Sequence, residues 1–171
     1  RIPGVVETSA GDTSAEEFWP AVEAALAKAL DGLGRMRERE GAHLAKDLKA
    51  RIGTMRKLTE QVARQAPTVA QRYRDQLVER IRQAGVPLAP ADDERLLKEV
   101  VIFADRSDIS EELTRLQSHF QQFDDCLRSS DSVGRTLDFL AQEMNREVNT
   151  IGSKANDGLI SQSVVQLKAE L

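Results

Sequence analysis

Apolar residues recur at helical spacing along most of the chain. Between Val22 and Val62 they return every third or fourth residue except from Met36 to Leu44, which predicts one long amphipathic helix reaching about Arg64. No stretch alternates apolar and polar residues as a half-buried strand would. The same helical pattern returns over residues 68–84, 92–104, 107–128, 133–151 and 159–171. The sequence therefore predicts an all-α fold of long antiparallel helical hairpins.

One of these segments has a regular apolar seam. Its large apolar side chains are spaced alternately four and three residues apart, as in a coiled coil. They are Ile109, Leu113, Leu116, Phe120, Phe123 and Leu127. This spacing predicts that the hairpins pack as a coiled-coil-like bundle.

Glycine and proline divide the chain into three predicted parts. Residues 1–13 are expected to be an extended lead-in, and residues 14–84 a basic helical hairpin. Gly85, Pro87 and Pro90 form the clearest break, and a second helical domain is expected over residues 92–171. The chain starts at Arg1 and its last helix has no stop signal, so we expect both ends to be cut from a longer protein.

Charge is distributed unevenly along a chain of 171 residues with a net charge of −4. Residues 28–82 contain fourteen basic and seven acidic residues, whereas residues 92–171 contain nine basic and sixteen acidic ones. A basic half beside an acidic half favours a nucleic-acid partner, although solvated helices also carry such charges. The single Cys126 excludes an internal disulfide, and no apolar run approaches the roughly 20 residues of a membrane span.

Chemically useful side chains share one stripe of the helix predicted over residues 107–128. Asp108, Glu112, Arg115 and His119 follow one another at intervals of four, three and four residues. Carboxylates, an imidazole and a guanidinium are the groups that metal-assisted phosphodiester cleavage requires. The alternative is a salt-bridged helix flank in which Glu112 pairs with Arg115.

The helix predicted over residues 133–151 has a second unusual face. Glu143 and Glu147 lie one turn apart, and Asp138, Asn145 and Asn149 are mediocre helix formers in a helix interior. Contacts between subunits or a ligand site would explain them. The sequence has no glycine-rich phosphate loop, and aromatic residues make up only 4%, so we expect RNA contacts to be directed at the backbone.

Three runs of sequence resemble the YicC/YloC endoribonuclease family of bacteria. They are DRSDISEELTRLQSH at residues 105–119, GRTLDFLAQEMNREVNTIGSK at residues 134–154 and MREREG at residues 36–41. The resemblance implies a cytoplasmic RNA endonuclease that depends on a divalent cation, Mn²⁺ or Mg²⁺, without a small-molecule cofactor or a membrane partner. It also implies a homo-oligomer, a hexamer, and an N-terminal domain missing from this chain. Members usually carry a basic residue where this chain has Thr136.

The resemblance turns the two polar stripes into candidate sites. We expect Glu112, His119, Glu143 and Glu147 to be catalytic, with the first three also binding the metal. The candidate RNA-binding residues are Arg37, Arg39, Lys46, Arg115, Arg135, Arg146 and Lys154.

Two reactions fit these parts. A water activated by the metal would leave a 5′-phosphate and a 3′-hydroxyl, whereas a base such as His119 acting on the ribose 2′-hydroxyl would leave a cyclic phosphate. An alternative function is a helical oligomerisation and RNA-binding module whose catalysis depends on the missing N-terminal domain.

Overall fold

The computed structural model describes residues 15–85 and 92–171, and every element in them is a helix. The predicted lead-in, with Ser14 as a helix cap, and the break at Pro87 and Pro90 lie outside the described residues. The all-α prediction is confirmed for the described part of the chain. The helices are α1 (Ala15–Gln65), a 3₁₀ turn (Ala66–Thr68), α2 (Val69–Gln83), α3 (Asp92–Arg106), α4 (Ser110–Arg128), α5 (Gly134–Lys154) and α6 (Gly158–Glu170).

The chain divides into two compact units, Arg1–Ala45 and Lys46–Leu171, and the boundary falls within helix α1. In the first unit the apolar positions keep the predicted helical spacing, but their side chains are exposed. The exposed ones are Phe18, Trp19, Val22, Leu26, Leu30, Leu33, Met36 and Leu44. The predicted long helix is confirmed, since α1 ends at Gln65, but burial along it begins only at Ile52. The described residues of the first unit include no second element that could cover that face.

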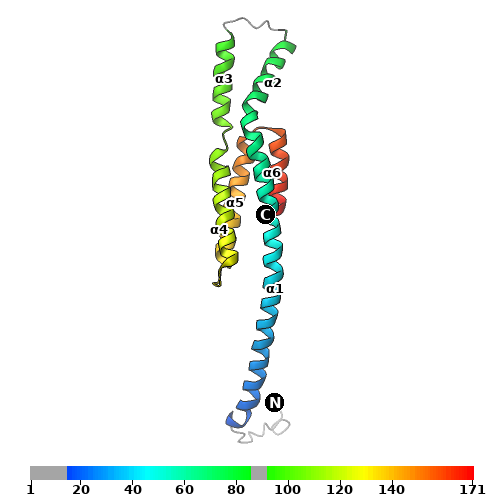
Figure 1. Ribbon diagram of the computed structural model, residues 1–171, viewed down its shortest axis with the longest axis vertical. Coiled ribbons are helices and arrows are strands. Elements are labelled where there is room, and N and C mark those ends of the chain that lie inside the picture. The colour runs from blue at the N-terminus through cyan, green and yellow to red at the C-terminus, as the bar shows by residue number, and fades with distance from the viewer. Residues whose placement is uncertain (1–14, 86–91) are drawn as a thin grey trace, which may run out of the picture. The chain divides into compact units, whose positions relative to one another are not determined.

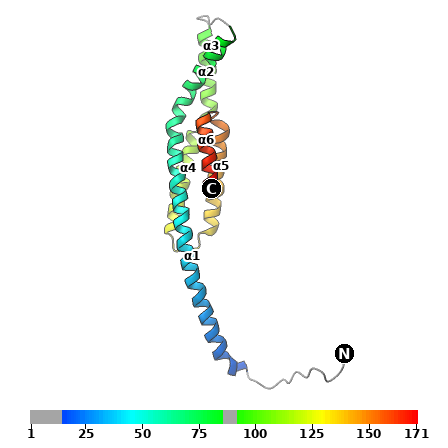
Figure 2. The same cartoon turned by 90° about the vertical axis from the view of Figure 1, so that its right-hand side faces the viewer.

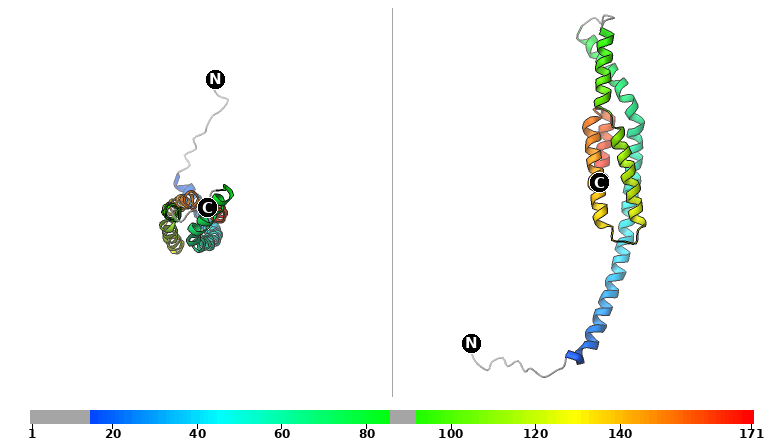
Figure 3. Two further views of the ribbon diagram at one scale, coloured as in Figure 1. Left: turned by 90° about the horizontal axis from the view of Figure 1, so that it is seen from above. Right: turned by 90° about the vertical axis from the view of Figure 1, so that its left-hand side faces the viewer.

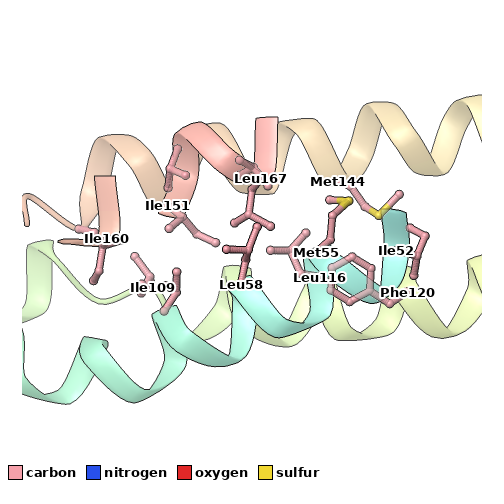
Figure 4. Packing of buried hydrophobic residues seen from close by; sticks show 14 of the residues in the cluster. Ile52, Met55, Leu58, Ile109, Leu116, Phe120, Met144, Ile151, Ile160 and Leu167 are labelled. Carbon is pink, nitrogen blue, oxygen red and sulfur yellow. The ribbon is translucent and has the colours of Figure 1, made fainter. Parts of the chain in front are cut away.

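The core of the second unit lies between the end of α1 and helices α4, α5 and α6 (Figures 1 and 2). Large apolar side chains from all four helices meet there (Figure 4). Among those fully buried are Met55 and Val62, Leu116 and Phe120, Met144 and Ile151, and Ile160 and Leu167. Burying such side chains contributes on the order of 1.5–3 kcal/mol each, which makes this core the main source of stability.

Helices α4 and α5 form a hairpin joined by the short loop after Arg128 (Figure 3). The predicted seam of α4 faces the core, with Leu116, Phe120 and Phe123 buried. Arg56 of α1 fastens this hairpin from the side, donating hydrogen bonds to the Phe120 carbonyl oxygen at 2.9 Å and to Asp124 Oδ2 at 2.7 Å. The hairpin is thus held between a hydrophobic seam and a part-buried ion pair.

The start of α4 has no side-chain cap. Its N-cap residue is Ile109, whose apolar side chain cannot accept a hydrogen bond. Asp108 instead accepts a hydrogen bond from the backbone N–H of Ser110 at 2.9 Å. The burial of Ile109 against the core explains this start, because its packing fixes where the helix begins.

Helix α6 packs closely against α5 because Gly152 has no side chain. A Cβ atom at this position would lie 3.0 Å from Cγ1 of Val164. The predicted turn before α6 is present, with Asn156 at a φ of 45° and Asp157 capping the helix by accepting from two backbone N–H groups. Asp157 also holds Arg72 of α2 at 2.8 Å, which ties α2 to the core.

Helices α2 and α3 pack on each other through stacked rings of Tyr73 and Phe103, whose centroids lie 3.7 Å apart. Within the described residues, no helix combines the length and the apolar character required to cross a membrane.

Candidate metal centre

The ionisable side chains of α4 and α5 meet along one edge of the hairpin, beside the core. Arg115 on α4 reaches Glu147 on α5, and Glu112 reaches Lys154 further along. As the residue number rises along α4 from 112 to 115, the number of its partner on α5 falls from 154 to 147. This order is expected for helices that run in opposite directions. This pairing brings together residues that are more than thirty positions apart in the chain.

At one end of the edge, Glu112 and Lys154 form a part-buried ion pair. Lys154 Nζ donates to Glu112 Oε1 at 2.7 Å, and the Glu112 side chain is only 4% exposed. Glu112 raises the pKa of Lys154 through this hydrogen bond and its charge, and Glu111 and Asp108 act in the same direction. The carboxylate of Glu112 is thereby neutralised by a cation of the protein itself.

In the middle of the edge, Arg115 lies between two carboxylates. It donates to Glu111 one turn earlier on α4 and approaches Glu147 Oε1 at 3.5 Å across the hairpin. The predicted pair of Glu112 with Arg115 is absent, because Glu112 turns toward Lys154 instead. Arg115 itself remains about half exposed.

At the other end of the edge, His119 meets Glu143 and Glu147. One potential ligand atom from each of the three side chains lies within 4.8 Å of the others, which is a spacing that a single metal ion can bridge. Glu143 and Glu147 are one turn apart, so α5 presents both carboxylates on the same side. Glu147 is buried, and its side chain is 8% exposed.

The donor atoms at this end fit a divalent cation. Nδ1 of His119 is buried and has no hydrogen-bond partner within the described residues, and such an atom requires an explanation. An imidazole nitrogen beside two carboxylate oxygens is a donor set suited to Mn²⁺ or Zn²⁺, while Mg²⁺ prefers oxygen alone. Arg115 and Arg146 offset part of the negative charge, because Arg146 donates to Glu143 at 2.8 Å.

The structure gathers only part of the expected metal-binding set. His119 and Glu143 lie together as expected, and Glu147 joins them, whereas Glu112 is held by Lys154. Residues seven apart on one helix have Cα atoms about 10 Å apart, so Glu112 and His119 are poorly placed to share one ion. The spacing of Glu143 and Glu147 was the better signal for a shared site.

The region that contains this centre matches a known family. Residues 62–171 match the model of the C-terminal part of the YicC-like endoribonucleases, and residues 1–46 match that of their N-terminal region. The chain belongs to the YicC-like endoribonuclease family.

Curated relatives in this family carry the name "Probable endoribonuclease YicC". The protein from Clostridioides difficile (strain 630) is 37% identical over 171 residues, covering 100% of this chain and 58% of the relative. The protein from Haemophilus influenzae is 37% identical over 172 residues, covering 98% of this chain and 57% of the relative. The chain thus spans somewhat more than half the length of the relatives it matches.

The remaining expected site residues are distributed over both units. Arg135 is exposed at the start of α5, and Arg146 has 74% of its side chain exposed while contacting Glu143. Arg37 and Arg39 belong to the first unit, where Arg39 lies 3.4 Å from Glu40, and Lys46 opens the second. Those three are exposed residues of α1.

Sequence reasoning missed one exposed side chain of α5. Phe139 lies one turn before Glu143 and is 56% exposed, although α5 buries apolar side chains on its opposite face. The helical period places Phe139 outside the apolar stripe of this helix, and that position was the available signal.

Proposed function

We propose that this chain is the cation-binding part of an RNA endonuclease that hydrolyses phosphodiester bonds. The observation that carries the proposal is the group formed by His119, Glu143 and Glu147, inside the region that matches an endoribonuclease family. The proposal includes the divalent cation, Mn²⁺ or Mg²⁺, and the homo-oligomer, a hexamer, that the family resemblance implies. It also includes RNA as the substrate and the cytoplasm as the place of action.

At the edge of the α4–α5 hairpin, different residues would bind the cation and the phosphate. His119, Glu143 and Glu147 would hold the cation, and a bound divalent cation supplies Lewis-acid activation and neutralises charge on the phosphate. Arg146 donates to Glu143 but has 74% of its side chain exposed, so its remaining guanidinium N–H groups can reach a phosphate oxygen. Arg115 would play the same part on α4 because it is half exposed beside Glu147.

The ligand set favours hydrolysis over attack by the ribose 2′-hydroxyl. An imidazole nitrogen that binds a cation cannot at the same time accept a proton, so His119 is a poor base for the 2′-hydroxyl. We therefore expect products with a 5′-phosphate and a 3′-hydroxyl. A cyclic 2′,3′-phosphate at the product ends would contradict this assignment.

The experiment is cleavage of an end-labelled structured RNA with Mn²⁺, with Mg²⁺ and with EDTA, followed by analysis of the product ends. We expect cleavage that requires the cation and leaves 3′-hydroxyl ends. No cleavage under any of these conditions, with RNA binding intact, would contradict activity of the chain by itself.

A second candidate is a helical oligomerisation and RNA-binding module that cuts only with the rest of the protein. The observation that favours it is the coverage of 58% of the relative's length. The same cleavage assay on a protein of the relatives' length separates the two functions. Cutting by the longer protein alone would support the module.

A further inference from the structure

The outer face of α5 carries an exposed aromatic ring beside the candidate metal centre. Phe139 is 56% exposed and lies four residues before Glu143, which places both side chains on neighbouring positions of one helix. The helical rise puts their Cα atoms about 6 Å apart along the axis. A group lying on the ring of Phe139 would thus be adjacent to a group held at Glu143.

Cationic side chains lie before and after this ring on the same face. Arg135 precedes Phe139 by one turn, and Arg146 follows it by about two turns. Both are exposed, and Arg135 makes no ion pair within the described residues. The scarcity of aromatic residues favoured contacts with the RNA backbone alone, but the exposed ring of Phe139 adds a surface for a base. An apolar ring between two guanidinium groups matches a nucleotide strand, whose bases stack on aromatic rings while its phosphates take the charges.

Amide side chains complete this face. Gln142 donates to Asp138 at 3.0 Å, and Asn149 is exposed without a hydrogen-bond partner within the described residues. Amides offer both donors and acceptors to base edges and to the ribose. Asp138 and Asn149 are also mediocre helix formers, and both are exposed, so packing within the chain does not explain them.

We propose that Phe139 is a stacking platform for an unpaired nucleobase next to the scissile phosphate, so that the enzyme selects single-stranded RNA segments. This inference rests on the proposed function. A base can lie on the ring only when it is free of a duplex, because paired bases stack on their neighbours. Phe139 would therefore set substrate class and would leave cation binding to His119, Glu143 and Glu147.

The test measures affinity for a single-stranded RNA that contains 2-aminopurine, in EDTA and at fixed low salt. We expect Phe139→Ala and Phe139→Leu to weaken binding roughly 5- to 100-fold and to abolish the quenching that stacking produces. Phe139→Trp should retain both, because it keeps an aromatic face. Affinity for duplex RNA of the same length should be unchanged in all variants.

A matched control is Leu97→Ala on α3, which removes a side chain that is 63% exposed and lies on another helix. This variant should bind RNA like the unaltered chain. Mn²⁺ affinity, measured by electron paramagnetic resonance, should be the same in every variant. Failure of the unaltered chain to bind Mn²⁺ would contradict the proposed function. An RNA affinity of Phe139→Leu equal to that of the unaltered chain would overturn only this inference.

A second copy of the chain is the competing occupant of this face. If it covers Phe139, Phe139→Leu will lower the mass found by sedimentation and leave RNA affinity per protomer unchanged. That result overturns the inference, as does failure of the unaltered chain to bind RNA while it binds Mn²⁺. An unchanged mass with weakened single-strand binding supports it.

Discussion

The two ends of the α4–α5 edge are built from similar side chains but balance their charge differently. At one end the buried carboxylate of Glu112 has a cation of the protein, Lys154, at 2.7 Å. At the other end Glu147 is nearly as buried, yet Arg115 approaches it only to 3.5 Å, and His119 keeps a buried nitrogen without a partner in the described residues.

The difference teaches how a structural ion pair is distinguished from a ligand site. Burying a carboxylate is costly unless a positive charge and hydrogen bonds accompany it. Lys154 supplies the positive charge and one hydrogen bond to Glu112 within the chain, while Oε2 of Glu112 has no hydrogen-bond partner in the described residues. The group of His119, Glu143 and Glu147 has Arg115 and Arg146 beside its carboxylates, and we propose that a cation from solution completes its charge balance. This difference between the two ends can be tested at each of them.

The end of the edge with His119, Glu143 and Glu147 is called the open end, and the end with Glu112 and Lys154 the closed end. The largest effect should follow the loss of a candidate ligand at the open end. Removing a group that only supports a ligand typically costs 10–100-fold in metal affinity, so His119→Ala, Glu143→Gln and Glu147→Gln should each lower Mn²⁺ affinity by more than about 100-fold. Electron paramagnetic resonance of free and bound Mn²⁺ measures this directly. RNA cleavage should fall in parallel.

A close control exists on α2. Glu79 and Arg82 are three residues apart and 2.9 Å from each other, close to the 2.8 Å between Glu143 and Arg146 at the same spacing. Glu79→Gln therefore removes the same kind of surface pair away from the centre and should leave Mn²⁺ affinity unchanged. Equal losses in Glu79→Gln and Glu143→Gln would show that the effect is only one of overall charge.

A smaller effect, and on stability instead of cation binding, should follow the loss of Lys154 at the closed end. Lys154→Met leaves Glu112 buried without its partner, so we expect the free energy of unfolding to fall, though by less than for a fully buried pair because Lys154 is partly exposed. Urea unfolding measures this. Mn²⁺ affinity should stay within about threefold of the unaltered chain, since a threefold change is under 1 kcal/mol.

Two further variants sharpen that prediction. Lys168→Met removes an exposed lysine of α6 and should be almost neutral. The double variant Glu112→Met with Lys154→Met should regain much of the lost stability, because a buried ion pair is often replaced by apolar groups without loss. A double variant no more stable than Lys154→Met alone would mean that Lys154 acts through packing.

The helices could be predicted from the sequence because their signals are local. Periodic apolar residues and the breaks at Pro67 and Gly158 set the elements, and the structure departs from them by a few residues at the ends. Burial of the first half of α1 could not be predicted, because it depends on what else packs there. Helical spacing is the same for Leu26, which is exposed, and for Met55, which is buried.

The candidate site was predictable only in part, for a related reason. Spacing along one helix identified the stripe with Glu112 and His119, and separately the turn with Glu143 and Glu147. Which residue of α4 faces which residue of α5 depends on the alignment of the two helices, and nothing local reveals that Lys154 reaches Glu112. The sequence therefore supplied the right residue types, and the pairing of helices sorted them into an ion pair and a ligand group.

The smallest effect should come from Asp108, at the closed end. The backbone N–H of Ser110 lowers the pKa of Asp108, helped by the Ser110 hydroxyl and by the charge of Lys154. A carboxyl whose pKa is lower in the folded state stabilises the fold above its unfolded pKa of about 3.9, and this contribution is lost as the pH falls through the folded pKa. Asp108→Ala should therefore cost less than about 1 kcal/mol at pH 7, because Asp108 is exposed to solvent.

Urea midpoints measured from pH 7 down to pH 3 provide the comparison. The difference between the unaltered chain and Asp108→Ala should shrink as the pH approaches 3, because protonation removes the charge-assisted part of the bond to Ser110. Mn²⁺ affinity at pH 7 should not change. A difference that stays constant over this range would mean that Asp108 stabilises the start of α4 through its shape and not through its charge, and the closed end would then depend on Glu112 and Lys154 alone.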